Sequence, residues 1–265
     1  MKSLLTTTTF SSRQKLKDFL DEKADHYNQP AFLKEDPVQI PHSLKRKEDK
    51  EIAGFLAATI AWGQRPTIIR NAYSILERMD GAPHDFVCNA QAEDLKRLEG
   101  FVHRTFNDSD LLYFIEALRN IYSSHGGLEQ VFTAAFNSDA DASDAIACFR
   151  SVFFELDHLP RTQKHIANPQ KGSSAKRINM YLRWMVRQDT KGVDLGLWKG
   201  ISPSKLYLPL DTHTGNIARQ LGLLERKQND WKAVAEVTSN LSKLDPKDPV
   251  KYDYALFGLG VYETV

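Results

Sequence analysis

A cluster of basic side chains is the first feature of this sequence that could serve a chemical role. The 31 residues from Arg161 to Lys191 hold eight Lys or Arg and a single acid, which gives this window a charge of +7. The whole chain carries +1, so the other 234 residues sum to −6. A basic patch of this kind suits a phosphate backbone. The alternative interpretation is a solvated helix face, which is the usual role of charge clusters.

Cysteine content and hydropathy exclude several classes of protein. Cys88 and Cys148 lie 60 residues apart, so they cannot form a paired-Cys zinc site or a four-Cys iron-sulfur cluster. Two unpaired thiols fit a reducing compartment. No stretch approaches the ~20 consecutive apolar residues that span a bilayer, and the apolar start is too short for a signal peptide. We therefore expect a soluble, cytoplasmic protein with no membrane partner.

The elements that must position any site are helices. Ser11 and Ser12 can cap a first helix, in which apolar residues recur at three- and four-residue spacing up to Tyr27. The segment from Ile52 to Trp62 is apolar on nearly all sides, which predicts a central helix. We find no convincing alternating strand, so the predicted fold class is all-α. Further helices are expected at about 66–79, 91–98, 109–124, 128–137, 141–156, 174–188, 213–222, 230–243 and 249–261.

Two segments of the chain resemble a known family. Residues 169–180, PQKGSSAKRINM, read as a glycine-bearing turn that opens a helix at Lys176. Residues 209–222, PLDTHTGNIARQLG, are similar to the D-T-H segment of helix-hairpin-helix DNA glycosylases, which include endonuclease III and the 8-oxoguanine glycosylases. Residues 51–64, 231–244 and 252–260 look like further helices of that superfamily. Residues 177–187 and 193–198 look like an uncharacterised bacterial family within it.

The resemblance implies a catalytic pair. In the superfamily the lysine after the hairpin is the nucleophile and the aspartate of the D-T-H segment is the essential carboxylate, which by position are Lys176 and Asp211. A neutral amine could add to the anomeric carbon, expel the base and form a Schiff base that undergoes β-elimination. The carboxylate could stabilise the positive charge that develops on the sugar. Alternative roles are phosphate binding for Lys176 and helix N-capping for Asp211.

The resemblance also implies residues that contact DNA or the damaged base. Gln64 ends the early apolar helix, where the family has a side chain that fills the gap left by an extruded base. His213 is expected to support the turn, and a general-base role is the alternative. For the aromatic residues the alternative is core packing. The remaining candidates are Trp62, Lys171, Gly172, Ser173, Arg177, Met180, Trp184 and Trp198.

The turn departs from the family pattern. The usual hairpin, L-P-G-V-G-x-K, has two glycines that approach a DNA phosphate and a monovalent cation, whereas here only Gly172 is present. This departure weakens the implied cation site, and the sequence implies no other cofactor and no metal. The 35-residue interval between Lys176 and Asp211 is closer to the archaeal 8-oxoguanine glycosylases.

These observations lead to an expected organisation and function. The resemblance implies one glycosylase-like unit over 1–265, made of two helical lobes with a cleft between them. One lobe is a central helical barrel at 51–190 with a hairpin near 168–176, and the other combines 1–50 with 191–265. We expect a monomeric base-excision repair glycosylase with AP-lyase activity on double-stranded DNA that carries an oxidised purine such as 8-oxoguanine. The alternative is a non-catalytic nucleic-acid-binding protein that retains the fold.

Overall fold

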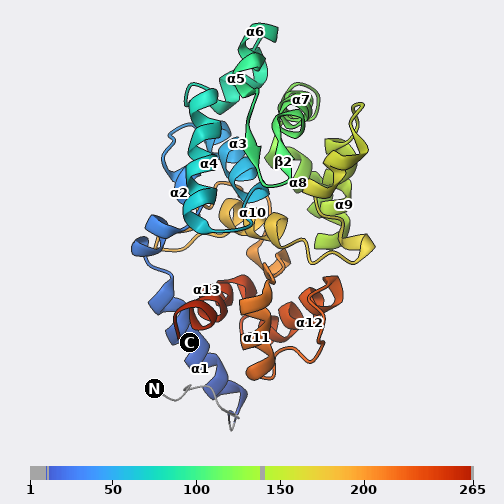
Figure 1. Cartoon of the computed structure of the whole chain (residues 1–265). Coiled ribbons are helices and arrows are strands. Elements are labelled where there is room, and N and C mark those ends of the chain that lie inside the picture. Colours follow the sequence, from blue (N-terminus) through green and yellow to red (C-terminus); the bar gives the residue numbers. More distant parts are fainter. Residues whose placement is uncertain (1–9, 11, 138–140, 264–265) are drawn as a thin grey trace. The chain divides into compact units, whose positions relative to one another are not determined.

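The computed structural model describes residues 10, 12–137 and 141–263. Most of these residues are helical, so the all-α prediction is confirmed (Figure 1). Contacts divide the chain into two compact units, with 33–168 in unit 2 and 1–32 plus 169–265 in unit 1. These boundaries differ from the expected ones at 50 and 190. Within the described residues, no helix is both long and apolar enough to cross a bilayer.

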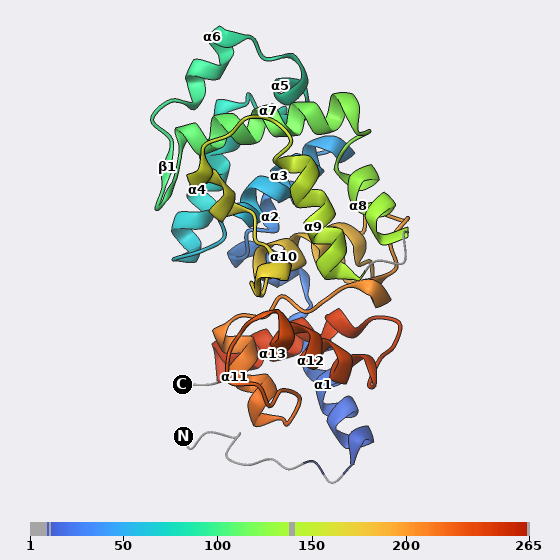
Figure 2. The same cartoon turned by 90° about the vertical axis from the view of Figure 1, so that its right-hand side faces the viewer.

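Unit 2 is built around a buried helix, as the apolar run predicted. Every residue of α3 (Lys47–Thr59) from Glu51 to Thr59 is buried. The Phe55 ring of this helix lies 5.8 Å from that of Phe114 in α7 (Asp108–Ser124) and 5.6 Å from that of Phe149 in α9 (Ala142–Phe153). Figure 2 shows α3 among these helices. The unit also contains α2 (Gln39–His42), α4 (Arg65–Arg78), α5 (Pro83–Asn89), α6 (Ala92–Leu95) and α8 (Leu128–Asn137).

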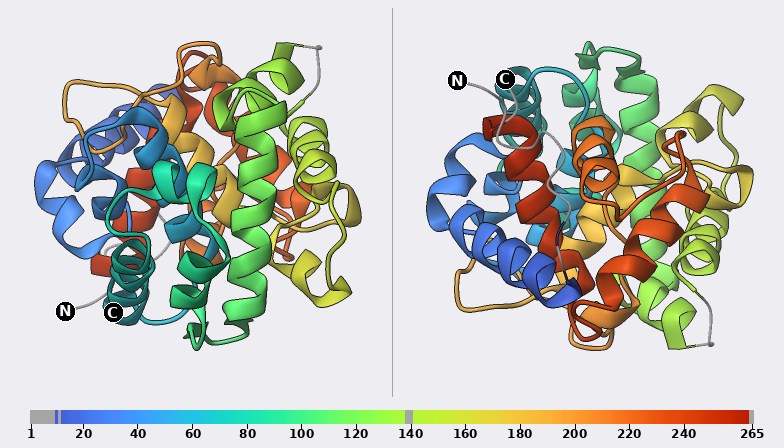
Figure 3. Two further views of the ribbon diagram at one scale, coloured as in Figure 1. Left: turned by 90° about the horizontal axis from the view of Figure 1, so that it is seen from above. Right: turned by 90° about the horizontal axis from the view of Figure 1, so that it is seen from below.

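Unit 1 combines the first helix with the last part of the chain. Helix α1 (Arg13–Tyr27) packs along α13 (Tyr252–Gly258), which continues as a π-helix over Leu259–Glu263 (Figure 3). Helix α11 (Thr212–Gln220) also packs against α13. Together with α12 (Trp231–Ser242), these helices bury an apolar core. Helix α10 (Lys176–Val186) belongs to the same unit and carries the candidate lysine.

Short polar side chains fix where several helices begin. Ser12, Asn107, Asp141, Asp211 and Asp230 each accept a hydrogen bond from a main-chain N–H in the first turn of the following helix. An N-cap of this kind contributes about 1 kcal/mol because it satisfies one of the otherwise unpaired donors. Ser11, the other cap candidate, lies outside the described residues. Asp211 and Asp230 begin α11 and α12 within one residue of their predicted starts.

Several short elements differ from the sequence-based expectations. Strands β1 (Val102–His103) and β2 (Phe106–Asn107) form an antiparallel hairpin, although no strand was predicted. Strands of two residues are too short to show an alternating pattern. The helix over 83–89 was also missed, because a seven-residue segment spans only two turns and gives little helical period.

Candidate active site

A constrained turn places Lys176 at the first position of α10. A 3-10 turn over Pro169–Lys171 leads into Gly172, whose φ is +88°, a region that favours glycine. The Ser173 hydroxyl then accepts a hydrogen bond from the Ala175 amide at 3.2 Å. The turn has only one glycine, as the sequence shows, but it opens the helix at the predicted lysine.

Ala175, the residue before the lysine, lies in the left-handed region with φ of +48° and ψ of +33°. For a residue other than glycine this conformation costs about 1–2 kcal/mol, so neighbouring contacts must hold it. Ser173 forms an isolated antiparallel bridge with Asp230, and the Trp231 amide donates to the Gly172 carbonyl at 3.1 Å. The start of α12 therefore fixes the turn from which Lys176 projects.

Asp211 both caps α11 and contacts the lysine. Its Oδ1 accepts a hydrogen bond from the Thr214 amide at 2.9 Å, which confirms the predicted N-cap. Its Oδ2 lies 3.4 Å from the Lys176 Nζ. The two side chains are 20% and 31% exposed, respectively, so solvent reaches the pair. One carboxylate thus uses one oxygen for helix capping and offers the other to the amine.

Asn229 and Arg219 hold the main chain of Asp211. The Asn229 amide donates to the Asp211 carbonyl at 3.0 Å, and the Arg219 guanidinium donates to Asn229 Oδ1 at 2.6 Å. Gly215 makes room for this arrangement, because a Cβ at that position would lie 2.8 Å from Asn229 Oδ1. Asn229 is not among the residues predicted for the site. It lies 18 residues after Asp211, in a loop where its sequence neighbours give no signal of this contact.

Toward the end of α10, Arg183 in the helix and Arg187 directly after it are buried among carboxylates. Arg183 pairs with Asp194, Nε to Oδ1 at 3.1 Å, and with Asp253 of α13. Arg187 pairs with Asp194 at 3.1 Å, with Asp189 at 2.6 Å and with Asp248 at 2.9 Å. Both arginine side chains are only 5% exposed.

Asp253 of α13 is a titratable residue near the Lys176–Asp211 pair, and no role is predicted for it from the sequence. Burial, with smaller contributions from the charges of Asp211 and Asp194, raises the pKa of its carboxyl to about 6, although the charges of Arg183 and Lys176 oppose the rise. The sequence does contain a signal for this residue, since Asp253 is a lone acid between two tyrosines in an otherwise apolar helix. An acid that is buried in such a helix must be paired or protonated.

The surface charge of the 161–191 window is smaller than the sequence suggests. Arg183 and Arg187 pair with carboxylates inside unit 1, so these two of the eight cations do not contribute to an exposed basic patch. Arg161 pairs with Asp110 at 2.8 Å, and Lys191 pairs with Asp25 at 2.6 Å. The helical repeat explains why these two arginines are not on the surface. Arg183 and Arg187 follow Lys176 by seven and eleven positions, so they lie on one side of the helix, which faces α13.

The other candidates in unit 1 fall into two groups. Lys171, Gly172, Ser173 and His213 are exposed, and Arg177 is half-buried. Burial lowers the pKa of Arg177 to about 10, which leaves it charged at neutral pH. Met180, Trp184 and Trp198 are 8%, 0% and 1% exposed, so neither tryptophan has surface on which a base could stack. Their burial corresponds to the alternative of core packing.

The remaining two candidates lie in unit 2. Trp62 is half-buried, with its ring edge-on to that of His103 at 5.0 Å between centres. Gln64 is exposed at the start of α4. Gly63 joins them with φ of +110°, and a Cβ there would lie 3.0 Å from the Arg104 guanidinium.

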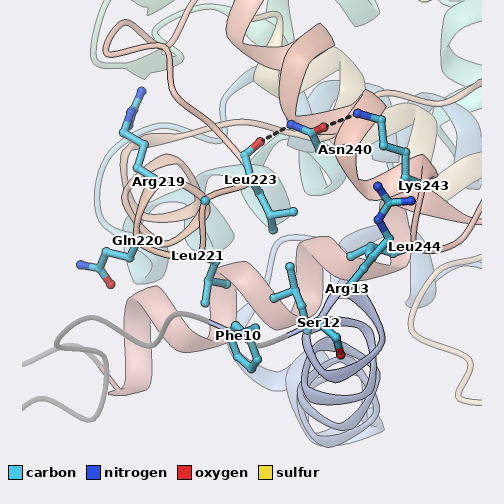
Figure 4. A pocket seen from close by; sticks show the side chains of 12 residues that line it. Phe10, Ser12, Arg13, Arg219, Gln220, Leu221, Leu223, Asn240, Lys243 and Leu244 are labelled. Atoms are coloured by element: carbon cyan, nitrogen blue, oxygen red, sulfur yellow. Dashed lines mark hydrogen bonds between the residues drawn. The ribbon is translucent and has the colours of Figure 1, made fainter.

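The pocket drawn in Figure 4 lies away from the candidate pair. Its volume is about 410 Å³, and it lies in unit 1 where the start of α1 meets the last turns of α11 and α12. Asp211 is at the opposite end of α11, so this pocket is not the site of the pair. Among the described residues, no three His, Cys, Asp or Glu side chains gather in a group that could hold a metal ion.

Comparison with known proteins gives one family. A model of the DUF2400 family, described as a protein of unknown function, matches residues 36–262, a range that includes Lys176, Asp211 and Asp253. No curated protein and no solved structure matches this chain. Because the match covers most of the sequence, the chain belongs to the DUF2400 family of proteins of unknown function.

Proposed function

We propose that this protein is a DNA glycosylase with AP-lyase activity, in which Lys176 is the nucleophile and Asp211 the essential carboxylate. The observation that carries the proposal is the 3.4 Å separation of Lys176 Nζ and Asp211 Oδ2, two residues 35 positions apart in the sequence. Their partial exposure leaves both groups accessible to a substrate. We further propose that the helical chain has the two-lobed fold of this superfamily and acts as a cytoplasmic monomer.

The chemistry of this pair suits cleavage of an N-glycosidic bond. The neutral Lys176 amine adds to C1′ of the deoxyribose as the bond between C1′ and the base breaks, and the base leaves with a proton. Asp211 stabilises the positive charge that builds on the sugar. Opening of the sugar gives a Schiff base with Lys176, and β-elimination then expels the 3′ phosphate. An oxidised purine such as 8-oxoguanine is the proposed base, on the strength of the resemblance in the D-T-H segment.

The turn before α10 provides a surface for the DNA backbone. Lys171, Gly172 and Ser173 are exposed there, and α10 begins directly after the turn. The first turn of a helix offers unpaired N–H groups and a positive dipole, which favour a phosphate. We propose that this turn binds a phosphate next to the lesion, and that Gln64 contacts the DNA from unit 2.

Borohydride trapping tests the lyase reaction. The protein is incubated with duplexes that carry oxidised, alkylated or deaminated bases, and the Schiff base is reduced to a stable covalent adduct. We expect an adduct with the native protein, none with Lys176→Gln, and at least a hundredfold slower trapping with Asp211→Asn. Lys199→Gln is the matched control, since Lys199 is exposed and bonds to Gln188. An adduct that survives Lys176→Gln would overturn the role of the lysine.

The second candidate function is a non-catalytic nucleic-acid-binding protein. One observation favours it, namely that the turn before α10 holds the single glycine Gly172 where the family pattern has two. In that case duplex DNA binds with a strong salt dependence, while neither adduct nor free base forms on any duplex. A base-release assay is run in parallel, because a glycosylase without lyase activity releases the base without forming an adduct.

A further inference from the structure

The pocket of unit 1 drawn in Figure 4 has an apolar floor. Its volume of about 410 Å³ is typical of pockets that bind a small molecule. Phe10 and Leu16 at the start of α1 line it together with Leu221, Leu223 and Leu244, which follow α11 and α12. These five residues belong to the apolar core of the unit or pack against it. The pocket is therefore a gap at the edge of that core, in which an apolar group can be buried.

The charged side chains around this floor are all positive. Arg13, Arg219 and Lys243 line the pocket, and none of the described residues that line it is Asp or Glu. Arg219 is already engaged, because its guanidinium donates to Asn229 and to two main-chain carbonyls of the loop after α11. Arg13 and Lys243 therefore remain as the cations that can meet a ligand.

The fold of unit 1 does not account for a cation at position 13. Arg13 is the first residue of α1 after the Ser12 cap, and a positive charge there opposes the helix dipole. Its side chain is exposed, and within the described part of the chain it has no acid partner. Arg13 therefore does not stabilise the start of α1 electrostatically, but it adds a positive charge to the pocket that it lines.

Asn240 of α12 holds the second cation beside the apolar floor. Its Oδ1 accepts a hydrogen bond from Lys243 Nζ at 2.8 Å, and its Nδ2 donates to the Leu223 carbonyl at 3.0 Å (Figure 4). Among the described residues no acid pairs with Lys243, so its charge stays uncompensated. An ammonium group has three donors, which leaves two of them for a ligand. The amine is thus tied to the segment that carries the floor residue Leu223.

We propose that this pocket binds a small amphiphilic anion, in which one carboxylate or phosphate group is joined to an aliphatic or aromatic body. The body packs on the apolar floor, and the anionic group binds Arg13 and Lys243. A neutral apolar molecule would leave both cations unpaired, and a DNA phosphate would leave the floor empty. The pocket is separate from the proposed lyase site, because Asp211 lies at the opposite end of α11, and neither proposal depends on the other.

Fluorescence titration of the full-length protein with anilinonaphthalenesulfonate tests the site. This probe joins an aromatic body to one sulfonate, which stands for the carboxylate or phosphate, and its emission rises in apolar surroundings. We expect saturable binding of one molecule per chain with a Kd below about 1 mM. The comparison compound is phenylnaphthylamine, which has the same rings and no charge. Absence of saturable binding of the sulfonate would overturn the proposal.

Substitution of each cation separates charge from packing. Arg13→Gln and Lys243→Gln should each weaken binding of the sulfonate about fivefold and change binding of phenylnaphthylamine less than about twofold. Lys232→Gln, at the opposite end of α12, makes the same charge change and should alter neither affinity. All three side chains are exposed, so the variants should fold. Sulfonate binding that neither Arg13→Gln nor Lys243→Gln weakens would contradict the proposal, as would equal weakening for both compounds.

Amide chemical shifts of ¹⁵N-labelled protein locate the bound probe. The pocket is lined from three segments, so we expect the sulfonate to shift amides within 12–16, 220–223 and 240–244. Amides of α3, in unit 2, should not move. Shifts confined to other segments would show that the probe binds elsewhere and would overturn the assignment of the pocket.

Competition identifies the anionic group. Octanoate and octyl phosphate share an aliphatic body, and each is added to the protein with the probe bound. Displacement of the probe by octanoate indicates a carboxylate ligand, and displacement by octyl phosphate indicates a phosphate ligand. If neither compound displaces it, the pocket does not take amphiphilic anions of this class and the proposal fails.

Discussion

Asn229 donates a hydrogen bond to the main-chain carbonyl of Asp211 at 3.0 Å, and so ties a loop residue to the start of α11. The carbonyl of an N-cap residue also accepts the first bond of its helix, here from the Gly215 amide at 2.9 Å. The position of the Asp211 carboxylate relative to Lys176 therefore depends on Asn229, although Asn229 is not among the residues that contact the amine in the described structure.

A substitution at Gly215 tests this dependence. In Gly215→Ala the new methyl group would lie 2.8 Å from Asn229 Oδ1 and 3.0 Å from Arg219, so the Asn229 bridge must shift. Both atoms are side-chain ends that can move, and alanine favours a helix over glycine, so we expect stability in urea unfolding to change by less than about 1 kcal/mol while trapping falls about tenfold. Asn216→Ala, at an exposed position on the same helix, is the control. If Gly215→Ala forms the borohydride adduct as fast as the native protein, the hydrogen bond from Asn229 does not position Asp211.

Substitution of Gly172 tests the energetic cost of backbone conformation separately from that of a steric clash. No atom lies within 4 Å of a Cβ placed there, so Gly172→Ala creates no clash, but its φ of +88° is unfavourable for alanine. We expect a loss of about 1–2 kcal/mol in thermal or urea unfolding. In Gln170→Ala, an exposed position of the same turn, stability should change by less than about 0.5 kcal/mol. Equal stability of the two variants would mean that the turn relaxes without cost.

Asp253 should make stability depend on pH. Folding raises its pKa from 3.8 to about 6, so its contribution is fully present below pH 3.8 and is lost as pH rises through 6. Between pH 4.5 and 7.5 the native protein should therefore lose about 2 kcal/mol that Asp253→Asn does not lose. Urea unfolding of both proteins at the two pH values gives the difference, which isolates Asp253 from the other titrating groups. Parallel pH dependence in the two proteins would show that Asp253 is ionised throughout.

Local signals explain which parts of the site could be predicted. The start of α10 at Lys176 and the cap at Asp211 depend on residues within a few positions of each, and both were identified from the sequence. The central helix α3 was identified because its burial on all sides requires an apolar run. The resemblance in the D-T-H segment brought Lys176 and Asp211 together as candidates, and their 3.4 Å separation agrees with that pairing.

Long-range pairing explains what could not be predicted. Arg183 and Arg187 look like surface cations when only their own window is considered, since Asp189 is its single acid. Of their other partners, Asp194 lies just beyond the window, and Asp248 and Asp253 lie more than 60 residues after the arginines. A helical period places the two arginines on one face but does not reveal what that face contacts. The sequence around Trp184 likewise does not reveal what its ring contacts, because a tryptophan at that position could line a pocket or pack in the core.

The contact between Gly258 and Tyr27 gives the last prediction, on the packing of α13 against α1. A Cβ on Gly258 would lie 2.2 Å from the Tyr27 ring, so Gly258→Ala should cost about 1–3 kcal/mol in urea unfolding. In a Tyr27→Ala background the ring is gone, and the same substitution should cost nothing or stabilise by up to about 0.5 kcal/mol, because alanine favours a helix over glycine. A double-mutant cycle measures this difference as a coupling energy of at least about 1 kcal/mol. Additive effects of the two substitutions would mean that the cost of Gly258→Ala comes from the α13 backbone itself. The close approach of α1 and α13 would then not be the reason for glycine at this position.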